Sequence, residues 1–178
     1  MIEHQRPGWL VKQRLFVQAL NSKEERVKLN RAGEDRQEIM NGLRKDGYSE
    51  IVIDHWLTPR NFGQMQKYDG YSNKFTGSCG DSMWVWIKVN NDIIQEASYI
   101  SDVCIGSITC GSILTEMIKG KSIGSALRIS QDDILKELGG LPAQFAHCAK
   151  LAKDTLNLAI IDYNAYKNTP WKRAYQKE

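Results

Sequence analysis

Residues 82–89 alternate between aliphatic and other side chains, which is the pattern of a β-strand with one buried face. The polar residues 90–92 that follow are typical of a tight turn, and residues 93–100 form a second apolar run of similar length. Two such runs joined by a short turn predict an antiparallel β-hairpin. A third strand is expected just before the hairpin, near residues 74–77.

Helical spacing of apolar residues predicts helices on both sides of this hairpin. Before it, Ser49 can cap a short helix that Pro59 ends. After it, helices are expected over residues 106–120, 122–127, 130–138 and from Pro142 to about Tyr166. Strands followed by helices, without βαβ alternation, indicate an α+β fold, namely a small antiparallel three-stranded sheet covered by helices.

The N-terminal quarter of the chain differs from the rest in charge. Residues 1–45 carry ten Lys and Arg against six Asp and Glu, whereas the remainder carries fourteen against fifteen. Within this segment, residues 9–20 favour a short amphipathic helix, and residues 22–45 favour either an exposed helix or disorder. We therefore expect a basic N-terminal extension over 1–45, one domain over 46–168 and a C-terminal tail over 169–178.

Composition excludes several classes of protein. The net charge of +3 is small and mixed in sign, so no nucleic-acid partner is expected. No run of eighteen apolar residues occurs, and cations interrupt the stretch 9–20, so neither a membrane span nor a secretory signal is expected. Four cysteines are too few for a disulfide scaffold. We expect a cytoplasmic protein; a mitochondrial targeting segment is the alternative, and the acidic residues that follow Lys23 disfavour it.

Three cysteines stand at the edges of predicted elements, where side chains from different parts of a chain can converge. Cys79 and Asp81 lie in a glycine-rich turn before the first hairpin strand, Cys104 lies where the second strand gives way to a helix, and Cys148 follows His147. Thiolates, an imidazole and a carboxylate together suit zinc or an iron–sulfur cluster. A carboxylate is a hard ligand for such a soft site, so Asp81 would make the bound group labile.

Each of these residues also has a structural reading. A free cysteine is often a small buried apolar group, and Cys110, in the middle of a predicted helix, is interpreted in that way. His55, beside a tryptophan on the first helix, is also interpreted as structural. Cys104 differs because a helix N-terminus favours its thiolate, the form that attacks sulfur; Cys104 and Cys148 are the candidate persulfide acceptors. The chain contains no CxxC, GxGxxG or P-loop motif.

At this point the motifs resemble the U-type iron–sulfur cluster assembly scaffold, the IscU/NifU N-terminal family. The resemblance rests on residues 48–63 (YSEIVIDHWLTPRNFG), 78–81 (SCGD), Cys104 with Gly106-Ser107, 114–121 (LTEMIKGK) and 141–148 (LPAQFAHC). Several motifs in the right order over residues 48–163 make it specific.

The resemblance implies a transient [2Fe–2S] cluster held by Cys79, Cys104 and Cys148, with Asp81 or His147 as the exchangeable ligand. It further implies zinc in the cluster-free form, sulfur from a cysteine desulfurase, an iron donor, and delivery of the cluster to carriers or recipient apo-proteins. A homodimer is compatible with it, and a protein of this kind is not an enzyme.

One motif departs from the family pattern. The family segment that a dedicated Hsp70 chaperone recognises usually reads Leu-Pro-Pro-Val-Lys, whereas here Leu141-Pro142 is followed by Ala143-Gln144-Phe145. The missing basic residue argues against recognition by such a chaperone.

Two other functions remain open. One is a zinc-bound sulfur acceptor of a desulfurase, the SufU type, which usually lacks the histidine before the last cysteine and has a longer spacing. The presence of His147 and the spacing of 44 positions from Cys104 to Cys148 favour the scaffold. The other is a structural zinc domain whose activity lies in residues 1–45.

Overall fold

The computed structural model describes residues 33–169, apart from 74, 78–79 and 102–103. The chain divides into two compact units, Met1–Asp46 and Gly47–Glu178. In the first unit the described part is helix α3, Gly33–Lys45, within the segment for which an exposed helix or disorder was expected. The helix expected over residues 9–20 lies outside the described residues.

The second unit is built around the predicted hairpin. Strands β3 (Ser82–Asn90) and β4 (Ile93–Ser101) pair antiparallel, and Asn91 and Asp92 form the turn with φ of 51° and 57°. Positive φ at both turn residues is what a two-residue hairpin turn requires, and Asn and Asp tolerate it better than most residues. The hairpin prediction is therefore confirmed.

The third strand of the prediction is divided into two short strands. Strands β1 (Gly70–Tyr71) and β2 (Phe75–Thr76) both pair antiparallel with β3, so the sheet has four strands within the described part of the chain. Between them the Ser72 hydroxyl accepts a hydrogen bond from the Val85 backbone N–H at 2.8 Å. Because this side chain takes the place of a backbone carbonyl, the ladder of backbone hydrogen bonds is interrupted there.

Helices follow the order expected from the sequence. They are α4 (Glu50–Leu57), α5 (Ile105–Ile118), α6 (Ile123–Leu127), α7 (Gln131–Glu137) and α8 (His147–Tyr166). The Ser49 hydroxyl accepts from the Val52 N–H, as predicted for an N-cap. Ser130 and Asp133 form a reciprocal capping box, and the hydrogen bonds from the Ser130 backbone and side chain lower the pKa of Asp133.

The start of the last helix was predicted wrongly. Pro142 does not open α8: its ψ of 142° is extended, and Ala143–Phe145 form a separate 3₁₀ turn, η1. The ring of proline fixes only φ, so the same residue can precede a turn as readily as it can begin a helix. Helix α8 begins at His147, so His147 and Cys148 lie in its first turn.

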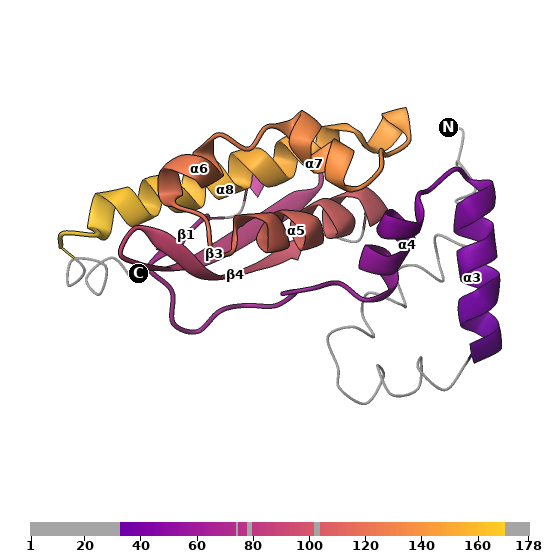
Figure 1. Cartoon of the computed structure of the whole chain (residues 1–178), viewed down its shortest axis with the longest axis horizontal. Helices are drawn as coiled ribbons and strands as arrows, with labels where there is room; N and C mark the ends of the chain where they lie inside the picture. Colours follow the sequence, from indigo (N-terminus) through magenta and orange to yellow (C-terminus); the bar gives the residue numbers. More distant parts are fainter. Residues whose placement is uncertain (1–32, 74, 78–79, 102–103, 170–178) are drawn as a thin grey trace, which may run out of the picture. The chain divides into compact units, whose positions relative to one another are not determined.

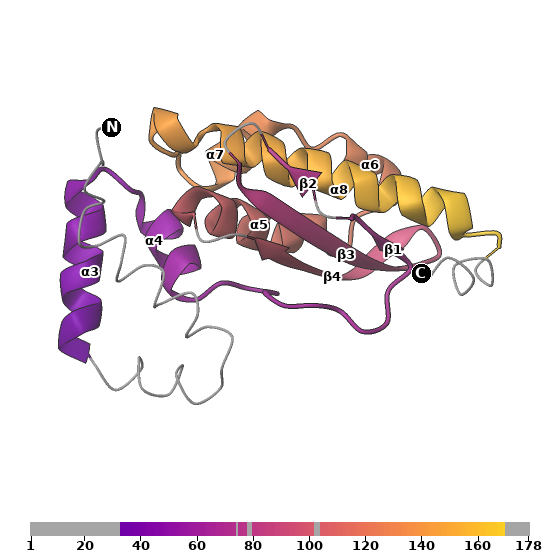
Figure 2. The same cartoon turned by 180° about the vertical axis from the view of Figure 1, so that it is seen from behind.

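Helices α5 and α8 cover one face of the sheet, and α6 and α7 pack outside them (Figures 1 and 2). Met83, Val85 and Ile87 point from β3 into this interface with no exposed surface. Helix α5 approaches β4 closely at Gly111, where a Cβ would lie 2.3 Å from the Tyr99 ring. The Tyr99 hydroxyl donates to the Ile108 carbonyl at 2.6 Å, which fixes the helix on the strand.

Helix α4 is attached to α5 through a buried histidine. His55 Nδ1 lies 2.7 Å from Ser112 Oγ, and the same oxygen accepts the Arg60 backbone N–H at 2.8 Å. Burial lowers the pKa of His55, and the Arg60 guanidinium lowers it further. The carboxylates of Glu116 and Asp54 raise it, but the net shift is downward. His55 therefore has the structural position that was expected. Among the described residues, no helix is long and apolar enough to span a bilayer.

Candidate metal and sulfur site

Cys104 lies at the junction of β4 and α5. It is the N-cap residue of α5, with an extended backbone (φ −73°, ψ 134°), and its side chain is partly exposed. The Ser107 hydroxyl donates to the Cys104 carbonyl at 3.0 Å and so holds the first turn of the helix. A thiol at this position is directed toward the positive end of the helix dipole.

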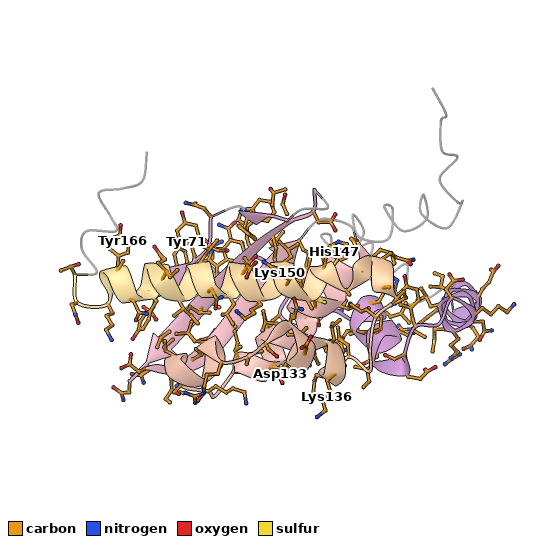
Figure 3. All side chains as sticks on the ribbon, turned by 90° about the horizontal axis from the view of Figure 1, so that it is seen from above. Tyr71, Asp133, Lys136, His147, Lys150 and Tyr166 are labelled. Carbon is orange, nitrogen blue, oxygen red and sulfur yellow. The ribbon has the colours of Figure 1, made fainter. Side chains whose placement is uncertain are left out.

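His147 and Cys148 begin α8, as Figure 3 shows for His147, with Lys150 further along the helix. Cys148 is fully buried, and its Sγ lies 3.5 Å from His147 Nε2. Asp81 approaches from the start of β3, after the positive-φ Gly80 and a turn in which the Gly77 N–H donates to the Asp81 carbonyl. Three separate parts of the chain therefore supply the polar side chains at this point.

The ligand atoms of Asp81, His147 and Cys148 all lie within 4.8 Å of one another. Cys104 joins the group through Cys148, with 3.9 Å between the two Sγ atoms. Four of the five residues predicted for the site are thus brought together. The fifth, Cys79, lies outside the described residues, two positions from Asp81.

Gly106 allows the two helices that carry the thiols to approach each other. A Cβ at this position would lie 2.8 Å from Cys148 Sγ and 3.0 Å from Phe145 Cβ. Distances this short require the neighbouring atoms to shift, so any larger residue at 106 would displace Cys148 or Phe145. In the sequence, Gly106 and Ser107 stand out only as part of the motif around Cys104. The need for glycine at 106, which makes room for Cys148, appears only in three dimensions.

The two thiols polarise each other. The Cys148 thiol, hydrogen-bonded to Cys104, lowers the pKa of Cys104, whereas burial raises it. The backbone N–H groups of Ser107 and Gly106 also lower this pKa, and the Asp81 carboxylate raises it. The net result is a lowered pKa for Cys104. The pKa of Cys148 is raised, because Cys104 takes the thiolate role and because the Cys148 thiol is buried. Cys104 is therefore the more reactive of the pair.

Other residues near the site have plainer roles. Cys110 is fully buried in α5, as expected for a core residue, and burial raises the pKa of its thiol. Phe145 stacks at a tilt against Tyr48, with ring centroids 6.2 Å apart. The sequence showed that Phe145 replaces a basic residue but gave no sign of this contact.

The donor types suit zinc. Two thiolates bound to one zinc at about 2.3 Å would have their sulfur atoms about 3.8 Å apart, close to the 3.9 Å that separates Cys104 and Cys148. The group whose ligand atoms all lie within 4.8 Å of one another consists of Asp81, His147 and Cys148; Cys104 adjoins it through Cys148, and Cys79 supplies a further thiol in the sequence. The residues present therefore fit both zinc and a cluster with thiolate ligands.

Comparison with known proteins places this chain in a family. Residues 47–170 match the family described as the NifU-like N-terminal domain. The chain is 45% identical over 118 residues to the iron–sulfur cluster assembly scaffold protein IscU of Aquifex aeolicus, a match that covers 65% of this chain and 75% of that protein. It is 41% identical over 122 residues to the scaffold protein IscU of Escherichia coli, covering 66% of this chain and 94% of that protein.

A solved structure agrees at the level of the fold. The NifU-like N-terminal protein of Brucella abortus superimposes with a TM-score of 0.52 at 16% identity, over 66% of this chain and 94% of that one. The α+β fold and the U-type resemblance read from the motifs are both confirmed. The chain belongs to the NifU-like N-terminal domain family.

Proposed function

We propose that this protein is an iron–sulfur cluster assembly scaffold and not an enzyme. It takes sulfur from a cysteine desulfurase and iron from a donor, builds a labile [2Fe–2S] cluster, and passes that cluster to carriers or recipient apo-proteins. The cluster is cargo. Its ligands are Cys79, Cys104 and Cys148, with Asp81 or His147 as the exchangeable partner.

The observation that carries this proposal is that the ligand atoms of Asp81, His147 and Cys148 lie within 4.8 Å of one another and that Cys104 Sγ lies 3.9 Å from Cys148 Sγ. Structural cysteines have no need of an imidazole and a carboxylate within 4.8 Å of one of them. The relatives named as cluster assembly scaffolds support the same role for this chain.

Cys104 is the better candidate for the first sulfur acceptor. It is partly exposed, whereas Cys148 is fully buried beside it. In this step the Cys104 thiolate attacks the outer sulfur of the desulfurase persulfide, the sulfur–sulfur bond breaks, and the desulfurase cysteine leaves as a thiolate. The new persulfide then lies next to the group that holds iron.

The test is anaerobic reconstitution with iron, cysteine and a desulfurase, after removal of zinc. The scaffold function predicts a visible chromophore with about two irons and two sulfides per cluster. Cys104→Ser should abolish the chromophore, and the matched variant Cys110→Ala, which removes the core thiol, should retain it. A wild-type protein that forms no chromophore would contradict the proposal.

A second candidate function is a zinc-bound sulfur acceptor of a desulfurase. The separation of 3.9 Å between the two thiols, which suits one tetrahedral zinc ion, favours it. We also propose that zinc occupies the site in the cluster-free scaffold. Tightly held zinc, no chromophore on reconstitution, and stimulation of the desulfurase that requires Cys104 would favour the acceptor over the scaffold.

We propose that residues 46–168 suffice for this function and that 1–45 and 169–178 are additions to it. Residues 46–168, expressed alone, should therefore form the same chromophore as the full chain. Loss of the chromophore on truncation would assign part of the function to one of the two removed segments. A cytoplasmic location and a homodimeric state stay predictions.

A further inference from the structure

The segment 138–145, which leads into the last helix, is held at both of its ends by the start of α4. At one end the Ser49 hydroxyl donates a hydrogen bond to the Leu138 carbonyl. At the other end the Phe145 ring lies against the Tyr48 ring, with 6.2 Å between the centroids. Two adjacent residues at one helix start therefore fix a segment that is distant from them in the sequence.

Phe145 is also in contact with the first turn of α5. A Cβ on Gly106 would lie 3.0 Å from the Cβ of Phe145, so the two backbones approach each other closely here. Tyr48, on the opposite side, is only 7% exposed. Phe145 therefore lies between the start of α4 and the start of α5.

The turn that carries Phe145 is continuous with the helix that carries two of the predicted ligands. One residue, Ala146, separates η1 from α8, and its backbone is helical (φ −58°, ψ −31°). The Ala149 N–H donates to the Ala146 carbonyl at 3.2 Å, which joins the turn to the helix. Among the described residues, no side chain caps the start of α8. Since a cap does not fix this helix end, the position of His147 and Cys148 depends on how η1 is packed.

We propose that Phe145 is a positioning residue of the metal site. Its ring, packed between Tyr48 and the first turn of α5, fixes the start of α8 and thereby holds His147 and Cys148 ready for a metal ion. The proposal rests on the proposed function, because it takes the site to bind metal. It assigns a role to the very position at which this chain departs from the family pattern: an aromatic anchor replaces a basic side chain.

We call the pair Tyr48 and Phe145 the aromatic clamp. Residues that orient metal ligands without binding the metal typically change metal affinity about 10- to 100-fold when they are replaced. An aromatic pair is suited to this purpose because its rings are favoured in contact beyond the area that they bury. Without the clamp, the first turn of α8 would have to be ordered when the metal binds, and the affinity would fall accordingly.

Metal binding to the metal-free full chain tests the proposal. The zinc Kd is measured by competition with a chromophoric chelator. Co²⁺ serves as the spectroscopic probe, since its charge-transfer and d–d bands report which atoms bind it and in what geometry. Phe145→Ala should raise the zinc Kd at least about tenfold and shift the cobalt bands. Phe145→Tyr, which keeps the ring, should match wild type in both measurements.

Phe62→Ala is the matched control. Phe62 is also partly exposed, and its ring packs edge-on against Tyr99 on β4, with 5.3 Å between the centroids. This variant should lose stability in urea without a change in zinc Kd or in the cobalt bands. Equal losses of zinc affinity in Phe62→Ala and Phe145→Ala would reduce the effect to general destabilisation and overturn the proposal.

The other half of the clamp provides an independent variant. Tyr48 is outside the predicted ligands, yet Tyr48→Ala should weaken zinc binding as Phe145→Ala does. The double variant should lose no more affinity than either single variant, because both remove the same contact. Fully additive losses would show that the two rings act separately and would overturn the clamp.

The outcomes separate this proposal from the function on which it rests. Wild-type zinc affinity and cobalt bands in Phe145→Ala would overturn the clamp and leave the metal site intact. A wild-type chain that binds neither zinc nor cobalt would overturn the metal site, and the positioning role with it. If Phe145→Ala does not fold, Phe145→Leu repeats the comparison: it keeps an apolar side chain without the ring and should still bind zinc more weakly than Phe145→Tyr.

Discussion

Gly106 lies so close to Cys148 that a single added Cβ would stand 2.8 Å from its sulfur atom. The contact joins the first turn of α5, which carries Cys104, to the first turn of α8, which carries Cys148. The separation of the two thiols therefore depends on a residue that has no side chain.

Gly106→Ala should damage the site more than the fold. The methyl group must displace Cys148 or Phe145, at a cost of about 1–3 kcal/mol in the free energy of unfolding. We expect weaker zinc binding and a lower yield of reconstituted cluster in a protein that still folds. Gly124→Ala is the matched control, because a Cβ there meets nothing within 4 Å; equal losses in the two variants would refute the role of Gly106.

Asp81→Ala should slow the release of a reconstituted cluster. The carboxylate is the hard ligand in a soft site, and its removal leaves thiolates and His147 around the cluster. The measurement is the rate of cluster transfer to an apo-ferredoxin, followed by visible absorption or circular dichroism. Asp132→Ala, which removes an exposed acid on α7, controls for the change in charge; transfer at the wild-type rate in Asp81→Ala would contradict the lability argument.

The buried His55 should make stability depend on pH. Burial, reinforced by Arg60, lowers its pKa below 6.5 in the folded state despite Glu116 and Asp54, so the folded protein favours the neutral ring. The stabilisation is therefore fully present above the unfolded-state pKa of 6.5 and is lost as the pH falls from there through the folded-state pKa.

His55→Asn should remove that part of the pH dependence, since an asparagine amide can still bond to Ser112 but does not titrate. Urea unfolding of both proteins between about pH 7.5 and about pH 5 provides the comparison. Wild type should lose more stability than the variant on acidification. Parallel pH profiles would show that His55 is not the group responsible.

The η1 segment should fail to bind a dedicated Hsp70. Phe145, which packs on Tyr48, stands where the family pattern has a basic residue. A peptide of residues 139–147 should not stimulate the chaperone's ATPase activity, whereas the same peptide with Ala143→Pro, Gln144→Val and Phe145→Lys should. Stimulation by the unmodified peptide would overturn the expectation.

Local signals were sufficient to predict most of the fold. Alternation in 82–89, the polar turn at 90–92 and the cap Ser49 act over a few residues, and the structure contains each of them. Pro142 misled because its fixed φ suits both a helix start and the 3₁₀ turn that it precedes. Division of the edge strand depends on Ser72 bonding to Val85, a long-range contact that no local pattern contains.

The site was predictable as a set of residue types and not as a geometry. Cysteines at element edges pointed to Cys104, Cys148 and their neighbours, because loops and helix ends are where ligands converge. The close approach at Gly106 and the burial of Cys148 behind Cys104 depend on how α5 packs against α8. These two facts add a difference in burial between Cys104 and Cys148 to the difference expected from the position of Cys104 at the start of a helix.

We expect this site to build and hold a cluster through Cys104. The most direct measurement is the visible spectrum of the anaerobically reconstituted, zinc-free protein, with iron and sulfide analysis, for wild type, Cys104→Ser and Cys110→Ala. We expect a labile chromophore with about two irons and two sulfides in wild type and Cys110→Ala, and none in Cys104→Ser. A wild-type protein without a chromophore, or a Cys104→Ser protein that retains one, would contradict it.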